Sequence, residues 1–148
     1  MKRISIASDH HGVKVKSKII EYLSKKGYEI IDYGTNSSES VDYPDLAFSI
    51  ANSIVNEESD RGILICYTGI GMSIACNRFK NVRCARVVDA EDAKHSRLDN
   101  DANVIAFSSK LPMYNIYDIL DVFLDTPFSN LERHQRRIDL LDKDFSND

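Results

Sequence analysis

The sequence predicts an α/β fold in which a five-stranded parallel sheet carries helices on both of its faces. Short apolar runs of strand length alternate along the chain with longer segments whose apolar residues recur at helical spacing. Strands that are separated by helices favour parallel pairing through right-handed crossovers. The 148 residues contain no internal repeat, long linker or low-complexity segment, so we expect one domain over residues 1–148.

The first half of the chain contains two strand–helix units. Residues 3–7 form the first predicted strand, and a helix that begins near Val13 continues until Gly27 stops it. Residues 28–33 form the second strand, and Pro44 opens the second helix. Apolar residues at helical spacing support both helices: Val15, Ile19 and Leu23 in the first, and Leu46, Ile50 and Ile54 in the second.

The second half of the chain continues this alternation. Three apolar runs predict strands at residues 62–66, 82–88 and 103–107. Helical patterns fill the gaps at about 72–79, 89–98 and 113–124. A charged segment at about 130–144 predicts a last helix at the C-terminal end.

The composition argues against several classes of protein. A formal net charge of −4 argues against general nucleic-acid binding. No apolar stretch approaches the length of a membrane span, and the N-terminal residues lack the apolar core of a signal peptide. The three cysteines form no Cys-x-x-Cys pair, which is typical of free cytosolic thiols. We therefore expect a cytoplasmic protein with no membrane or nucleic-acid partner, in which Cys76 and Cys84 are structural.

The segment Cys66–Asn77 is the most informative part of the chain. It begins where the third predicted strand ends and reads Cys-Tyr-Thr-Gly-Ile-Gly-Met-Ser-Ile-Ala-Cys-Asn. Glycines let the backbone approach a ligand closely, and the start of the following helix presents unpaired N–H groups. Such an environment stabilises an anion and favours the thiolate form of a nearby cysteine. The segment therefore suggests that Cys66 is a base that faces an oxyanion site.

Two other interpretations of this loop are weaker. Gly69-x-Gly71 matches half of a dinucleotide-binding fingerprint, but Ile74 occupies the third glycine position and the loop follows the third strand. A cysteine phosphatase would need an arginine six residues after the cysteine to bind the phosphate, and this position holds Met72.

Polar residues follow three of the predicted strands, and ligands of parallel α/β sheets bind beyond the carboxyl ends of strands. These residues are Asp9, His10 and His11 after the first strand, Cys66 and Thr68 after the third, and Ser108 to Lys110 after the fifth. The sequence therefore predicts a site there, although two adjacent histidines would equally suit a surface pair or a helix cap. Arg133 and Arg137 share one face of the last helix, where they form either a solvated face or a pair that binds one phosphate.

Several motifs taken together resemble the ribose-5-phosphate isomerase B family, which also includes the subunits of galactose-6-phosphate isomerase. They are Ser8-Asp9-His10, Ser40–Pro44, Cys66–Asn77, Ser96-Arg97, Asn100–Val104, and Arg133-His134 with Arg137. The resemblance covers nearly the whole chain and implies a Rossmann-like three-layer α/β/α sandwich. It also implies a homodimer, or a tetramer, with active sites at the subunit interface. The implied reaction interconverts an aldose phosphate and its ketose with no cofactor and no metal.

The resemblance also implies roles for individual residues. Cys66 resembles the base that moves a proton between C2 and C1, because the weakly acidic α-proton of a hydroxy-aldehyde needs a positioned, ionised base. Thr68 and the loop of Gly69, Ile70, Gly71, Met72 and Ser73 would stabilise the enediolate oxygen. Asp9 and His10 resemble the family's sugar-contacting pair, and Asn100 would hold a hydroxyl. The phosphate would be bound by Lys110, Arg133 and Arg137.

Four places depart from the family pattern, one of which is the Gly-Gly that usually precedes Arg-His, replaced here around Asn130-Leu-Glu132. The other three are single positions. Asp99 replaces a histidine that helps to open the sugar ring, Tyr67 replaces a glycine and adds bulk at the pocket wall, and Lys110 replaces an arginine. His10 is then a candidate for the acid that Asp99 cannot supply. We expect interconversion of ribose 5-phosphate and ribulose 5-phosphate, a step of the pentose phosphate pathway. The alternatives are an isomerase of a six-carbon substrate, allose or galactose 6-phosphate, and a catalytically impaired sugar-phosphate-binding homologue.

Overall fold

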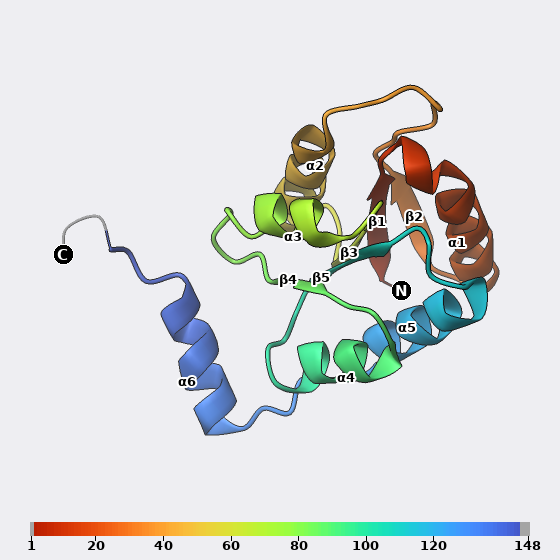
Figure 1. Ribbon diagram of the computed structural model, residues 1–148. Coiled ribbons are helices and arrows are strands. Elements are labelled where there is room, and N and C mark those ends of the chain that lie inside the picture. Colours follow the sequence, from red (N-terminus) through yellow and green to blue (C-terminus); the bar gives the residue numbers. More distant parts are fainter. Residues whose placement is uncertain (1, 146–148) are drawn as a thin grey trace.

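A five-stranded sheet runs through the protein in the order β2-β1-β3-β5-β4, and all of its neighbouring pairs are parallel (Figure 1). The computed structural model describes residues 2–145. The strands are β1 (Arg3–Ser8), β2 (Glu29–Asp32), β3 (Arg61–Cys66), β4 (Cys84–Arg86) and β5 (Val104–Ser108). The predicted α/β class is confirmed.

Helices cover both faces of this sheet. One face carries α1 (Val13–Lys25), α4 (Ala90–Leu98) and α5 (Met113–Asp125), and the other carries α2 (Tyr43–Val55) and α3 (Ile70–Cys76). A single 3-10 turn, η1 (His10–Gly12), precedes α1, and α6 (Glu132–Leu141) ends the described chain. These layers confirm the three-layer sandwich. Within residues 2–145, no helix combines the length and the apolar character needed to cross a membrane.

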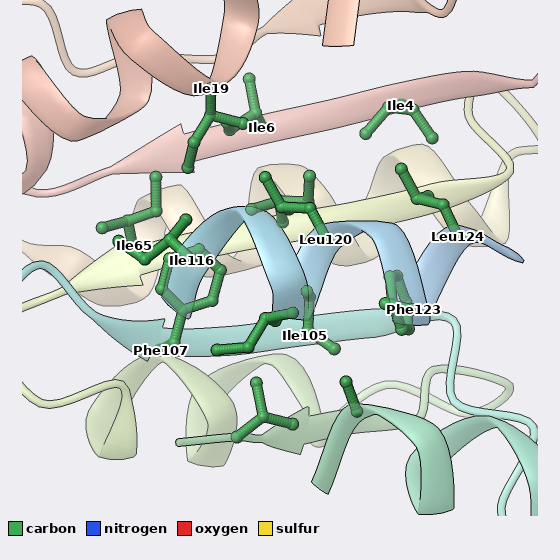
Figure 2. Close-up of a cluster of buried hydrophobic side chains, with 14 of the residues drawn as sticks. Ile4, Ile6, Ile19, Ile65, Ile105, Phe107, Ile116, Leu120, Phe123 and Leu124 are labelled. Atoms are coloured by element: carbon green, nitrogen blue, oxygen red, sulfur yellow. The ribbon is translucent and has the colours of Figure 1, made fainter. Parts of the chain in front are cut away.

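The core consists of two apolar clusters, one on each face of the sheet. Alternation along β3 sends Ile63 and Ile65 to the α1–α5 face and sends Leu64 and Cys66 to the α2–α3 face. Figure 2 shows the first cluster, in which Ile116, Leu120 and Phe123 of α5 lie over side chains of β1, β3 and β5. Burying one such side chain contributes about 1.5–3 kcal/mol. The packing of the core therefore fixes the face of the sheet to which the Cys66 side chain points.

The fourth strand and the third helix are shorter than the sequence predicts. The predicted strand over 82–88 is reduced to β4, because the N–H of Val82 turns back to the carbonyl of Phe79. The helix expected at 72–79 ends at Cys76, because the side chain of the next residue, Asn77, forms hydrogen bonds with the edge strand. The Asn77 carboxamide accepts the N–H of Cys84 at 2.7 Å and donates to its carbonyl at 2.8 Å. A polar side chain thus ties the end of α3 to the edge strand.

Helix α6 lies beside the edge strand β4, apart from the two helical layers (Figure 1). Its C-terminal end is attached through the Asp142 carboxylate, which accepts the N–H of Asn81 at 2.8 Å. A cavity of about 400 Å³ separates this end of the helix from β4. Ile138 is the buried side chain of α6, whereas Leu131, Leu140 and Leu141 are exposed in or beside it.

Candidate active site

The loop after β1 is folded against the end of β3. The N–H of Asp9 donates to the carbonyl of Ile65 at 3.0 Å, and the Asp9 carboxylate accepts the N–H of His11 at 3.0 Å. Gly12 makes this close approach possible, because a Cβ there would lie 2.8 Å from Cγ2 of Ile65. Asp9 is therefore buried and fixed, and His10 follows it at the same edge of the sheet as Cys66.

Cys66 is the last residue of β3, and its side chain is held by the loop that follows. The Sγ atom accepts the N–H of Gly69 at 3.0 Å, and the residue is 6% exposed. Gly69 adopts a left-handed conformation (φ 81°), and a Cβ at this position would lie 2.9 Å from the Cα of Phe107. Only glycine fits this turn, which directs a backbone N–H to the sulfur. The sulfur is thereby held in a fixed position beside the start of the next helix.

We expect the substitution Gly69→Ala to lower the free energy of unfolding by about 3 kcal/mol, since it combines backbone strain with a backbone collision. Gly27→Ala is the matched control: Gly27 also has a positive φ (94°), but no atom lies within 4 Å of its Cβ position. Backbone strain alone should lower the free energy of unfolding of the Gly27→Ala variant by about 1 kcal/mol. Urea unfolding of both variants measures the difference, and equal losses would contradict the close approach to Phe107.

The start of α3 lies directly behind this turn. Thr68 Oγ1 accepts the N–H of Ile70 at 3.1 Å, which leaves its hydroxyl hydrogen available. The N–H groups of Gly71 and Met72 belong to the first helical turn, where the helix itself offers no acceptor. Tyr43 covers Gly71 so closely that a Cβ there would lie 2.7 Å from the ring. The position of Tyr43 was not predictable from the sequence, because a contact between the start of α2 and α3 leaves no local pattern.

The end of β5 completes this edge of the site. The N–H of Ser109 donates to the carbonyl of Cys66 at 2.8 Å, and the Ser108 hydroxyl donates to the carbonyl of Tyr67 at 2.6 Å. The Ser108 hydroxyl also accepts the N–H of Lys110 at 3.0 Å. The strand order places β1, β3 and β5 side by side, so the predicted convergence occurs. The residues gathered here are Asp9, His10, Cys66, Tyr67, Thr68, Gly69, Ile70, Gly71, Met72, Ser73 and Lys110.

Asp99 and Asn100 lie at the opposite edge of the sheet. Because β4 and β5 are parallel neighbours, α4 must return the chain to the amino end of the strands, and Asp99 ends that helix. Next to the start of β4, the guanidinium of Arg83 donates to the carbonyl of Asn100 at 3.1 Å. Within one chain, these two residues are therefore separated from Cys66 by the length of a strand.

The Asp99 carboxylate lies between two histidines. Its oxygens are 3.5 Å from Nδ1 of His95 and 3.8 Å from Nε2 of His134. The second imidazole is oriented by Ser129, whose hydroxyl is 2.8 Å from its Nδ1. Sequence reasoning missed His95, although its position four residues before Asp99 on a helix would have signalled it. His10, the acid suggested by the sequence, lies at the other edge of the sheet within one chain.

Arg133 and Arg137 are both exposed on α6. Within residues 2–145 neither of them forms an ion pair. The neighbouring Arg136 does form one, with 2.8 Å between its guanidinium nitrogen and a carboxylate oxygen of Glu132. Their spacing places both guanidinium groups on one side of the helix. This arrangement leaves two positive charges available to an external anion.

The other two cysteines are buried away from the glycine loop. Cys76 ends α3, and Cys84 begins β4. The pKa of the Cys84 thiol is raised above its ordinary value, mainly by its hydrogen bond with Cys76 and then by burial. Both residues are buried packing groups, as the sequence predicted.

Comparison with known proteins identifies the family of this chain. The family model described as Ribose/Galactose Isomerase matches residues 4–141. Ribose-5-phosphate isomerase B of Escherichia coli is 39% identical over 95% of both chains. A ribose 5-phosphate isomerase structure from Thermotoga maritima superposes with a TM-score of 0.91 at 43% identity, covering 95% of this chain and 97% of that one.

A second solved structure carries a ligand. It is ribose-5-phosphate isomerase B of Mycoplasma genitalium with bound ribulose-5-phosphate. It has a TM-score of 0.88 and 41% identity, and the match covers 93% of this chain and 91% of that one. Together with the match of the family model to residues 4–141, these similarities show that the chain belongs to the ribose/galactose isomerase family.

Proposed function

We propose that this chain interconverts ribose 5-phosphate and ribulose 5-phosphate, with Cys66 as the catalytic base. The observation that carries the proposal is the N–H of Gly69, which donates to Cys66 Sγ beside the first turn of α3. The Cys66 sulfur thus lies next to a set of backbone donors, which supports its assignment as the base. The relative from Mycoplasma genitalium, which holds ribulose-5-phosphate, supports this choice of substrate.

The reaction follows from these groups. In the aldose direction the Cys66 thiolate removes the proton from C2, and the electron pair forms the C1=C2 bond as negative charge moves onto O1. The Thr68 hydroxyl and the free N–H groups of Gly71 and Met72 stabilise this enediolate oxygen. The thiol then returns its proton to C1, while a proton moves from O2 to O1. Asp9 and His10 hold the sugar hydroxyl groups.

The remaining residues are supplied by a second copy of the chain. Asp99, Asn100, Arg133 and Arg137 cannot reach Cys66 of their own chain, because they lie on α6 and at the opposite edge of the sheet. In a homodimer the two arginines of one copy bind the phosphate of a sugar held by the other, together with Lys110. The exposed leucines around α6 provide apolar surface for this contact.

The closed furanose of ribose 5-phosphate must open before C2 can react. The Asp99 carboxylate accepts the proton of the anomeric hydroxyl, and one of its two neighbouring imidazoles donates a proton to the ring oxygen. The ketose cannot form the same ring because its O5 carries the phosphate. Ring opening is therefore needed only in the aldose direction.

The direct test is an isomerisation assay on five-carbon and six-carbon sugar phosphates, including allose 6-phosphate and galactose 6-phosphate. We expect the highest kcat/KM with ribose 5-phosphate, measured as formation of the ketose. A higher kcat/KM with a six-carbon substrate would support the proposed mechanism but contradict the proposed substrate. Binding of sugar phosphates without turnover of any of them would contradict the proposed activity.

A further inference from the structure

Tyr67 directly follows Cys66, and its ring lies beside the side chains of His11 and Lys110. The ring is 49% exposed and lies 4.8 Å from the His11 ring, measured between centroids. The ammonium nitrogen of Lys110 lies 4.1 Å from the centroid of the Tyr67 ring. These three side chains come from the ends of three different strands, and we call them the Tyr67 wall.

The contact between Lys110 and Tyr67 has the geometry of a cation–π interaction. Such contacts, within about 6 Å of the ring centroid, are attractive by about 0.5–1 kcal/mol at exposed sites. No carboxylate pairs with Lys110 among residues 2–145, so the aromatic face is the group that restrains its ammonium. The charge therefore remains available to an anion.

The backbone on both sides of this contact is already fixed. The Ser108 hydroxyl donates to the carbonyl of Tyr67 and accepts the N–H of Lys110. The freedom that remains is in the four-carbon stem of the lysine, which loses entropy when it is held at a ligand. A ring that holds the ammonium before the ligand arrives reduces this cost.

We propose that Tyr67 is a positioning residue, which holds the Lys110 ammonium over its ring so that the charge is preorganised for the phosphate group of the substrate. The inference deepens the proposed function, because it assigns the phosphate end of the sugar to the Tyr67 wall. The tyrosine ring restrains the flexible lysine, so that its charge is held in place as that of a more rigid cation would be. The interaction acts on binding of the phosphate and leaves the proton transfer at Cys66 unchanged.

A double-mutant cycle tests this inference. The variants are Tyr67→Leu, Lys110→Met and the double variant, with Tyr67→Phe as the conservative change that keeps the ring. The readouts are KM and kcat for ribose 5-phosphate, and the Kd of inorganic phosphate measured by calorimetry. We expect Tyr67→Leu to raise the KM and the phosphate Kd about two- to fivefold, with kcat little changed. Tyr67→Phe should retain the affinity, and Tyr67→Leu should add nothing when Lys110 is already methionine.

Two results would overturn the inference: independent, multiplicative losses in the double variant, or equal losses in Tyr67→Phe and Tyr67→Leu. The calorimetric arm separates this inference from the proposed function, since it needs no turnover. Coupling in the phosphate Kd without isomerase activity would support the positioning role and reject the reaction. Full isomerase activity without coupling would support the proposed reaction and reject the positioning role.

Discussion

Replacing Cys66 with serine is expected to lower kcat by about 10²–10⁴-fold, the range that a positioned general base contributes. The change is nearly isosteric, so the contact with the N–H of Gly69 and the fold should both persist. A serine hydroxyl does not ionise near neutral pH, so the C2 proton has no acceptor. Isomerase rates in both directions, together with the thermal unfolding midpoint, measure the effect.

Cys84→Ala is the matched control for this prediction. Cys84 is also a buried, free cysteine, but it belongs to the edge strand and forms a hydrogen bond with Cys76. We expect the control to lose stability and to retain its kcat. Iodoacetamide should inactivate the wild-type protein by labelling Cys66, and substrate should slow this labelling. A wild-type kcat in Cys66→Ser would refute the proposed base.

Mixing two inactive variants is expected to restore about a quarter of the wild-type activity, if each site takes residues from two copies of the chain. One variant carries Cys66→Ser, and the other carries Arg133→Ala together with Arg137→Ala. Loss of charge-assisted hydrogen bonds to the phosphate should weaken binding in the second variant by about 1.5–3 kcal/mol or more. In a mixed dimer one site contains both defects and the other contains neither.

The measurement is kcat/KM of the mixture after subunit exchange, compared with each variant alone. Random exchange makes about half of the dimers mixed, and one of their two sites is intact. If a single chain supplied the whole site, the mixture would show only the average of the two weak activities. Sedimentation at micromolar concentration should show dimers or larger species in every sample.

The local pattern of the sequence was sufficient to predict the layers and one edge of the site. Continuous apolar runs predicted β3 and β5, and the glycines after Cys66 predicted a close backbone turn there. That turn depends on the approach of Gly69 to Phe107, which requires the two strands to be neighbours. The strand order thus explains why residues that are far apart in the sequence meet at the Tyr67 wall.

Features that depend on long-range packing were not predictable in the same way. No local pattern predicts that Tyr43 covers Gly71, since the two residues lie on different helices. The second histidine at Asp99 comes from α6, more than thirty residues later in the chain, and only its first histidine has a local spacing signal. Strand β4 was predicted too long because apolar residues continue into the turn where the sheet ends.

The position of the two halves of the site at opposite edges of one sheet limits the ways in which copies can assemble. A two-fold axis that brings the carboxyl edge of one copy to the amino edge of the other also makes the reciprocal contact, so both sites close at once. A head-to-tail arrangement would instead fill every site only in a closed ring, and without closure it would continue as an open filament with an unfilled half at each end. If the site is shared as proposed, the two sites of a two-fold dimer close together, and any substitution that skews the axis should impair both of them.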